Sequence, residues 1–269
     1  MRPSMWVILF FAAVVSVGGT CRAEIGLISL TTERGEVVRA VLGVPDAGSG
    51  KRTAVIFNHG TDVRRDGYEG AKRGGSMDVD DYVKPLVQRG YVVVAPLRTL
   101  LAREATLDRG KLVGTPEQWD AVLDYGHRAI AAARKYLDGR ADVDTSSIVM
   151  MGYSEGGNLA LWSAIGNPTY RAVVLVAPAA MPTSTRYQLR MAANPENLRR
   201  IGVPVFLAVA TRDFDGIRGV TTEKLIPNMQ EIDPRFRFRT DYPGDHNRFF
   251  KIDRDLWADL TAFFQENGL

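Results

Sequence analysis

The chain has 269 residues, long enough for one large α/β domain with a well-buried core. Its hydrophobic content of 45% and charged content of 24% are those of an ordinary globular protein. The formal net charge of +3 is small, which gives no general case for nucleic-acid binding.

The first 23 residues have the pattern of a secretory signal peptide. Arg2 provides a short charged start, an apolar run extends from Met5 to Val15, and small residues lead to Ala23. The apolar run is too short to span a bilayer comfortably, so a signal peptide is favoured over a membrane anchor. The sequence therefore predicts an exported protein, periplasmic or secreted.

Cleavage after Ala23 would remove the only cysteine, Cys21, so the mature chain would have no disulfide and no thiol. It would also remove Arg2 and Arg22, leaving 32 of the 34 basic residues against 31 acidic ones. Lipid attachment at Cys21 is the less favoured alternative, because no leucine stands three residues before the cysteine.

Strand and helix patterns alternate from residue 24 to residue 269, with no repeat or linker between them, and predict a single domain. Strands are predicted at 27–30, 37–42, 54–57, 91–96, 148–151, 172–178, 203–210 and 237–240. Helices are predicted at 80–89, 115–137, 159–165 and 252–265, and long loops at 61–78 and after Pro96. Continuous apolar runs such as 54–57 are typical of strands buried on both faces. The fold class is therefore α/β: a mostly parallel, doubly wound sheet of about eight strands with helices on both faces.

The most informative stretch is Val149–Trp162, where an apolar run passes through Gly152-Tyr153-Ser154-Glu155-Gly156 into a helical pattern. A buried strand, a sharp turn carrying a serine and then a helix are the parts of a nucleophile elbow. Gly152 and Gly156 would provide room where the strand and helix crowd the turn. Ser154 would stand at a helix N-terminus, where negative charge is favoured. The motif alone is also compatible with a glycine-rich turn of no function.

Several segments together resemble the α/β-hydrolase superfamily, in particular its dienelactone-hydrolase-like and small-esterase branches. The resemblance covers nearly the whole chain after residue 23 and rests on the following segments: Asn58-His59-Gly60, Arg89–Pro96, Gly152–Gly157, Ala210–Asp213 and Gly244-Asp245-His246. It implies an α/β-hydrolase fold and a Ser-Asp-His catalytic triad in that chain order.

A serine hydroxyl needs a base, and the chain offers three histidines. His127 lies inside a predicted helix before the elbow and is expected to be structural. His59 ends a strand, where packing or loop ordering is favoured over catalysis. His246 follows the serine between the last strand and the last helix, so the family order makes it the base.

The resemblance places the triad acid three residues after Ala210, at Asp213, with Asp215 as the alternative. Asp245, beside the base, is expected to be a turn residue. For the oxyanion hole, the family uses two backbone N–H groups, which correspond here to Glu155 and Thr61. Gly60 would let the loop before Thr61 approach closely.

Nothing in the sequence supports a cofactor. There is no phosphate-binding loop, no dinucleotide-binding glycine motif and no cluster of metal ligands, so neither a metal nor a dinucleotide is expected.

The segment between Pro178 and Val203 is too short for a large lid, which favours small, water-accessible esters over long-chain lipids. The two predicted loops carry several basic residues: Arg64, Arg65, Lys72, Arg73, Arg98, Arg103 and Arg109. One interpretation is a cationic rim that selects acidic or phenolic-acid esters. The other is solvated loop charge, balanced by nearby acidic residues, and it is favoured because the signs are mixed.

The sequence thus predicts a serine hydrolase that cleaves small carboxylic esters through an acyl-enzyme. One alternative is a serine peptidase of the prolyl-oligopeptidase kind, and another is a non-catalytic binding protein with the same fold.

Overall fold

The computed structural model describes residues 23–46, 50–108, 111–167 and 169–269. The predicted signal peptide, apart from Ala23, lies outside the described residues, as do Cys21 and Arg109. Within these ranges, no helix combines the length and the apolar character needed to cross a membrane.

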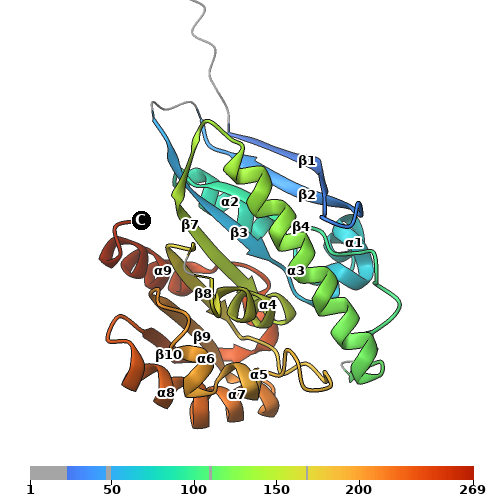
Figure 1. The fold of residues 1–269 in the computed structure, drawn as a ribbon, viewed down its shortest axis with the longest axis vertical. Coiled ribbons are helices and arrows are strands. Elements are labelled where there is room, and N and C mark those ends of the chain that lie inside the picture. Colours follow the sequence, from blue (N-terminus) through green and yellow to red (C-terminus); the bar gives the residue numbers. More distant parts are fainter. Residues whose placement is uncertain (1–22, 47–49, 109–110, 168) are drawn as a thin grey trace, which may run out of the picture.

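One eight-stranded sheet organises the molecule, with the strand order β1-β2-β4-β3-β7-β8-β9-β10 (Figure 1). Strand β2 pairs antiparallel with β1 and β4, and all other neighbouring pairs are parallel. The strands are β1 (Glu24–Thr31), β2 (Val37–Val44), β3 (Arg52–Asn58), β4 (Val92–Pro96), β7 (Val143–Tyr153), β8 (Ala172–Val176), β9 (Val205–Arg212) and β10 (Arg237–Asp245). The predicted mostly parallel sheet of about eight strands is confirmed.

Helices cover both faces of this sheet, as predicted. They are α1 (Thr61–Arg73), α2 (Asp80–Gln88), α3 (Pro116–Asp138), α4 (Glu155–Ala164), α5 (Leu189–Ala192), α6 (Pro195–Leu198), α7 (Asp215–Val220), α8 (Ile226–Ile232) and α9 (Arg254–Glu266), with a π-helical turn η1 (Thr221–Leu225) and a 3₁₀ turn η2 (His246–Phe250).

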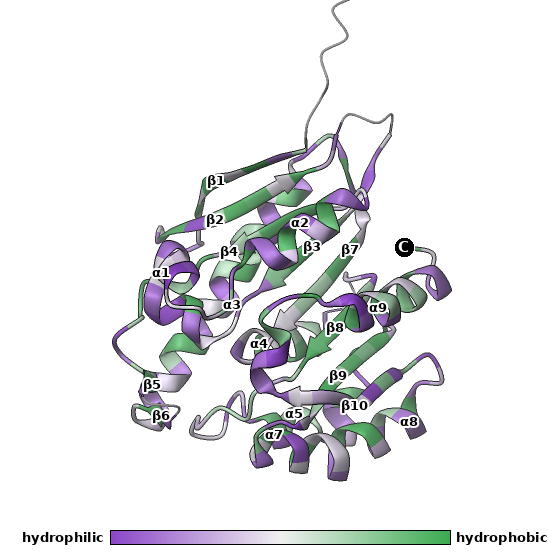
Figure 2. Cartoon of the chain, turned by 180° about the vertical axis from the view of Figure 1, so that it is seen from behind, coloured by the Kyte–Doolittle hydropathy of each residue, from purple (hydrophilic) through white to green (hydrophobic). Residues whose placement is uncertain are grey.

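The sheet separates two hydrophobic cores, which we call the α3 core and the α9 core. The α3 core contains buried side chains of α3 to α8, including Leu123. The α9 core contains those of α1, α2 and α9, including Leu256. Neighbouring residues of β3 alternate between them, since Ile56 belongs to the α3 core and Phe57 to the α9 core. Figure 2 shows the hydrophobic colour concentrated in inner strands such as β8 and β9.

The structure corrects the prediction of a loop at 61–78. Most of that stretch is helix α1, which kinks at Gly67, where φ is +71°. Two internal glycines, Gly67 and Gly70, lower the helix propensity of this stretch, and for that reason its sequence predicted a loop. Val63 and Ala71 are buried in the α9 core, and these tertiary contacts stabilise the helix.

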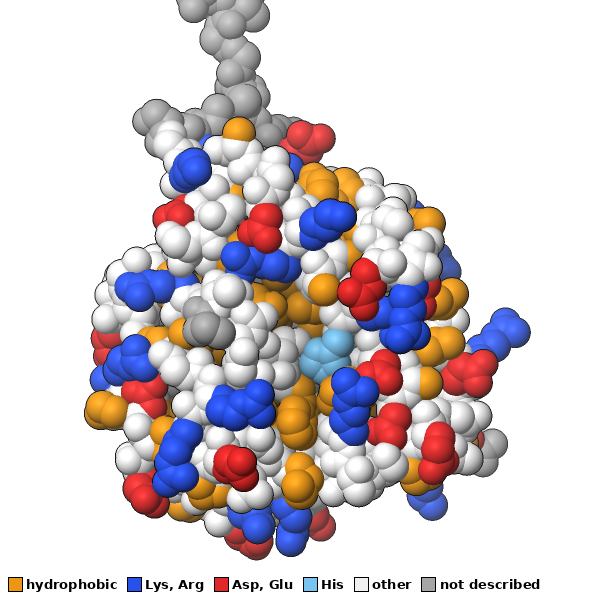
Figure 3. All heavy atoms as spheres, in the orientation of Figure 1, with side chains coloured by type: hydrophobic (Ala, Val, Ile, Leu, Met, Phe, Trp, Pro, Cys, Tyr) orange, Lys and Arg blue, Asp and Glu red, His pale blue; other side chains and the backbone are white. Residues whose placement is uncertain are grey.

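The stretch after Pro96 is also not a featureless loop. It contains a two-stranded hairpin of β5 (Thr106–Asp108) and β6 (Lys111–Val113). The segment between Pro178 and Val203 holds only the short helices α5 and α6, so no large lid is present in the described residues. On the face drawn in Figure 3, basic and acidic side chains are interspersed and neither sign forms a continuous patch.

Candidate active site

Ser154 occupies a strained turn between β7 and α4. Its φ of 56° and ψ of −119° lie outside the regions that non-glycine residues usually adopt. Three backbone hydrogen bonds hold it there. Its N–H donates to Val176 O at 2.9 Å, and its carbonyl accepts from the N–H groups of Asn158 and Ala179 at 3.1 and 2.9 Å. Such strain persists only where the surroundings fix it, and it concentrates at functional sites.

The glycines around Ser154 are required by close packing. A Cβ at Gly152 would lie 2.0 Å from Gly156 O, and a Cβ at Gly156 would lie 2.0 Å from Asn58 O. No side chain fits at these distances. At Gly60 a Cβ would lie 3.1 Å from the Tyr153 ring, which is tight but less severe. The backbone of the β3 loop can therefore reach the elbow directly.

The structure brings together the side chains predicted as nucleophile, base and acid. Ser154 Oγ lies 2.9 Å from His246 Nε2, and His246 Nδ1 lies 2.8 Å from Asp213 Oδ1. All three residues are at least nine-tenths buried. A carboxylate at Nδ1 fixes the imidazole tautomer that leaves Nε2 free to accept the serine proton.

Asp213 and Asp215 differ sharply in position. Asp213 Oδ1 also accepts from the N–H of Phe214 at 2.9 Å, so the carboxylate is anchored to the backbone. Asp215 is exposed at the start of α7. Asp245 caps η2 through a bond from Asn247 N, as expected for a turn residue.

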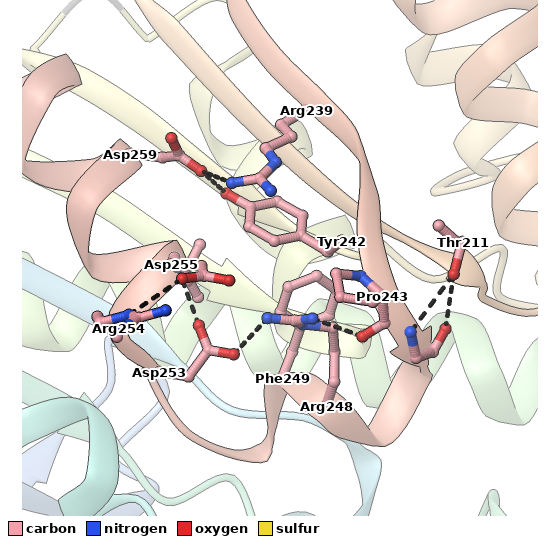
Figure 4. Close-up of polar contacts among 12 residues, drawn as sticks. Thr211, Arg239, Tyr242, Pro243, Arg248, Phe249, Asp253, Arg254, Asp255 and Asp259 are labelled. Atoms are coloured by element: carbon pink, nitrogen blue, oxygen red, sulfur yellow. Dashed lines mark hydrogen bonds and ion pairs between the residues drawn. The ribbon is translucent and has the colours of Figure 1, made fainter.

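A polar cluster holds the segment that carries His246 (Figure 4). Thr211 Oγ1 at the end of β9 bonds both the carbonyl and the N–H of Gly244, at 3.3 and 3.4 Å. Arg248 donates to Pro243 O at 2.5 Å and to the carboxylate of Asp253, the N-cap of α9. These bonds fix the chain on both sides of His246.

Thr61 and Glu155, predicted as oxyanion-hole donors, are the first residues of α1 and α4. N–H groups in the first turn of a helix have no partner within that helix, and they point towards the positive end of its dipole. Both residues therefore offer N–H groups at helix N-termini beside Ser154, an arrangement suited to an anion.

Two of the basic residues considered for a cationic rim, Arg64 and Arg98, do not lie on the surface. Each side chain is 1% exposed, and both bind the fully buried carboxylate of Glu155. Arg65 is exposed and pairs with Asp62 and Asp66. Both interpretations are therefore wrong for Arg64 and Arg98, which form neither a cationic rim nor solvated loop charge. Arg65 agrees with the favoured interpretation of solvated charge balanced by acidic residues. This cluster could not be recognised in the sequence, because a charged residue after the serine and arginines in predicted loops have the pattern of solvated charge.

Of the other two histidines, His59 is fully buried and His127 is partly buried, and both bond neighbouring groups other than Ser154. Burial, together with Arg98, holds the pKa of His59 well below its usual value. Its Nε2 accepts from Arg98 N at 3.2 Å, so its Nδ1 carries the proton and donates to Gly60 O at 2.8 Å. Burial lowers the pKa of His127 to about 4, and its Nδ1 bonds Ser163 Oγ at 3.0 Å.

A small, largely apolar pocket of about 210 Å³ opens beside Ser154 and His246. The hairpin contributes Leu107 and Leu112 to its wall, and the remaining apolar side chains come from separate segments: Met77, Ala179, Ala180, Met181, Phe214 and Ile217. Asp62 adds one carboxylate to the lining, and burial raises its pKa. Such a pocket suits a short apolar group more than an anion. Among the described residues, no group of three or more side chains of metal-ligand type could hold an ion.

Comparisons with known proteins agree with this architecture. A model of the dienelactone hydrolase family matches residues 70–265. A dienelactone hydrolase-like protein from Klebsiella pneumoniae superposes with a TM-score of 0.66 at 16% identity, over 90% of this chain and 98% of that one. An esterase from Pyrococcus furiosus gives 0.61 at 16% identity, over 91% and 90%.

A peptidase is also similar in fold. The Pyrococcus horikoshii acylaminoacyl peptidase superposes with a TM-score of 0.64 at 11% identity, over 91% of this chain. The chain spans only 42% of that peptidase. No curated protein matches the sequence. At such low identities, similarity to the solved structures shows the fold alone. Together with the match to the family model, it confirms the predicted α/β-hydrolase fold.

Proposed function

Because this chain belongs to the dienelactone hydrolase family, we propose that it is a serine hydrolase that cleaves small carboxylic esters through an acyl-enzyme. The observation that carries the proposal is the hydrogen-bonded series Ser154–His246–Asp213, with Ser154 in a strained turn at a helix N-terminus. An ordinary serine hydroxyl is a weak nucleophile, and this arrangement provides the base that activates it.

In the proposed reaction, Ser154 Oγ attacks the ester carbonyl carbon while His246 Nε2 takes its proton. The carbonyl oxygen becomes an oxyanion, which accepts hydrogen bonds from the N–H groups of Thr61 and Glu155. The intermediate then expels the alcohol, which receives the proton from His246. Water, deprotonated by His246, attacks the acyl-enzyme, and collapse of the second intermediate returns the proton to Ser154. Asp213 remains ionised and stabilises the imidazolium in both halves.

The pocket supports a substrate with a short, uncharged acyl group. Its volume of about 210 Å³ and its apolar lining leave little room for a long chain, and Asp62 disfavours a second negative charge. Arg64 and Arg98, which could have bound an anionic acyl group directly, do not line the pocket and are bonded to Glu155.

The first experiment is intact-mass spectrometry after treatment with a fluorophosphonate, with turnover of p-nitrophenyl butyrate measured in parallel. We expect one adduct on the wild-type protein, none on Ser154→Ala and strongly slowed labelling of His246→Ala. A folded wild-type protein that gives neither adduct nor turnover would contradict the proposal and favour a binding protein. Comparing the butyrate ester with the matching p-nitroanilide separates an esterase from a peptidase, because only a peptidase should also cleave the amide bond of the anilide.

A further inference from the structure

The side chain of Glu155 lies directly beneath the proposed oxyanion hole and is saturated with donors. Thr61 Oγ1 donates to Oε2 at 3.1 Å, Arg64 Nε lies 3.1 and 3.0 Å from the two oxygens, and Arg98 Nη1 donates to Oε1 at 3.2 Å. The carboxylate is 0% exposed. The backbone donor role proposed for Glu155 makes no use of this side chain.

The first of these bonds joins the two halves of the oxyanion hole. Thr61 begins α1 and Glu155 begins α4, and the two residues are 94 positions apart in the chain. Their N–H groups must remain in a fixed relation to bind one oxygen, because such donors act only when they are organised before the reaction. The hydrogen bond from the Thr61 hydroxyl to the Glu155 carboxylate provides that connection.

The cluster also carries an excess of positive charge. Two guanidinium groups face one carboxylate, and the neighbouring His59 is kept neutral by burial and by Arg98. A lone buried carboxylate here would oppose the negative charge that develops on the substrate. The second arginine leaves the cluster of Arg64, Arg98 and Glu155 with a net positive charge, which favours a negative charge developing nearby.

The excess is not needed to balance charge within the cluster. Arg64 Nη2 and Arg98 Nε are buried and have no hydrogen-bond partner among the described residues. Leaving buried donors of a charged group unpaired is unfavourable for folding, and removing one partner of such a cluster is costly. Buried donors that stay unpaired in a folded protein require an explanation, and a role in catalysis is one such explanation.

We propose that Glu155, Arg64 and Arg98 form a positioning unit that aligns the N–H groups of Thr61 and Glu155 and supplies positive potential behind them. The inference rests on the proposed function, since it concerns the oxyanion of that reaction. The three side chains act through the oxyanion hole and do not touch the substrate.

The alignment is tested with Thr61→Val, which keeps the side-chain shape but loses the hydroxyl, and with Thr61→Ser, which restores it. Kinetic constants are measured with p-nitrophenyl butyrate, and affinity is measured for butylboronic acid, whose serine adduct is tetrahedral and anionic. We expect Thr61→Val to lower kcat about tenfold, less than the loss of a whole oxyanion donor. Affinity for the boronate should fall by a similar factor, KM should stay within twofold, and Thr61→Ser should recover most of the loss.

Thr261 on α9 provides a matched control. Its hydroxyl bonds only the carbonyl of Trp257, four residues earlier in the same helix, among the described contacts. Thr261→Val should therefore leave kcat and boronate affinity unchanged. The proposal is overturned if Thr61→Val keeps the wild-type kcat, or if the valine and serine variants lose activity equally.

The charge is tested by comparing Arg64→Lys with Arg64→Met, after thermal melting has established that each folds. The methionine variant should bind butylboronic acid at least tenfold more weakly, whereas the lysine variant should stay within about threefold of wild type. Equal affinity of the two variants would overturn the charge argument. If the methionine variant does not fold, Arg98→Lys and Arg98→Met make the same comparison at the second arginine bound to Glu155. A wild-type protein that neither reacts with fluorophosphonate nor hydrolyses the ester contradicts the proposed function instead, so the two failures can be told apart.

Discussion

At the scale of single residues, the carboxylate of Asp62 makes the pocket favour uncharged acyl groups over anionic ones. It lines the pocket and lies next to Thr61, and its partner Arg65 is 3.5 Å away and one-third exposed. A carboxylate in this position repels an anionic acyl group more strongly than it would in open water, because the pocket is partly shielded from solvent.

We expect Asp62→Asn to reduce the preference for p-nitrophenyl butyrate over the corresponding hemisuccinate ester on the order of tenfold. The two acyl chains have nearly equal length but differ in charge. The ratio of the kcat/KM values of the two esters at pH 8 therefore measures the effect of the acyl-chain charge. Raising the salt concentration should shrink the wild-type preference as well, since salt screens it. An unchanged ratio in the variant would show that Asp62 does not face the acyl group.

The two aspartates after β9 give a second prediction at this scale. Asp213→Asn should lower kcat by about 10⁴, the order found when a triad carboxylate is replaced and the wrong tautomer is favoured. Asp215→Asn should retain activity within twofold, because the side chain is exposed and does not contact His246. Steady-state kinetics of both variants would check this, and the reverse result would transfer the acid role to Asp215.

At the scale of elements, the hairpin of β1 and β2 is fastened to α3 by one ion pair. Glu36, in the turn, accepts bonds of 2.8 and 2.6 Å from Arg128 and one of 2.7 Å from the Thr32 hydroxyl. The bond from Arg128 is the largest cause that lowers the pKa of Glu36, from 4.5 to about 2, while slight burial opposes the shift.

This pKa shift has a defined consequence in acid. Because the pKa is lower in the folded chain, the stabilisation is fully present above about pH 4.5 and is lost as the pH falls towards 2. Urea unfolding is measured between pH 2.5 and 6 for wild type and Glu36→Gln. As the pH falls, the free energy of unfolding should decrease more steeply in wild type, and the difference between the two slopes should correspond to at most one proton. Parallel curves for the two proteins would show that the pair is not formed in solution.

The local sequence pattern of each helix and strand determined whether that element could be predicted from the sequence. The inner strands are continuous apolar runs, and α3 begins with the capping box of Thr115 and Gln118, so both were predicted near their observed bounds. Helix α1 was missed because its glycines weaken the local pattern and its stability comes from tertiary contacts. The β5–β6 hairpin was missed because its strands have only three residues each.

For the candidate site, the serine motif indicated Ser154, and the family resemblance indicated His246 by chain order and Asp213 by its position after Ala210. The fold brings these three residues together. Arg64 and Arg98 could not be identified, because which basic residues are buried depends on packing between distant segments. Nothing in their local sequence distinguishes them from exposed Arg103.

At the scale of the whole molecule, the central sheet keeps the two cores apart. Leu123 on α3 and Leu256 on α9 are both fully buried, but they belong to different cores on opposite faces. Residues without shared partners contribute to stability independently.

We therefore expect Leu123→Ala and Leu256→Ala to cost about 2–5 kcal/mol each. In the double variant, the two losses should add within about 0.5 kcal/mol. Chemical denaturation of the four proteins in the cycle measures this. A pair within one core, Leu256→Ala with Leu260→Ala, serves as the comparison and should depart from additivity. Strong coupling across the sheet would mean that the strands relay strain between its faces.

The crowding at Gly152 and Gly156 has an evolutionary consequence. Both positions exclude any side chain for reasons of backbone contact alone, so selection for folding preserves them even after catalysis is lost. No backbone contact of this kind dictates the hydroxyl of Ser154, the imidazole of His246 or the carboxylate of Asp213. In a homologue that is no longer selected for catalysis, Gly152 and Gly156 should remain conserved longer than the catalytic side chains. Inactive relatives are therefore expected to keep the two glycines while varying at positions 154, 213 and 246. The presence of the two glycines alone then indicates common descent and does not indicate activity.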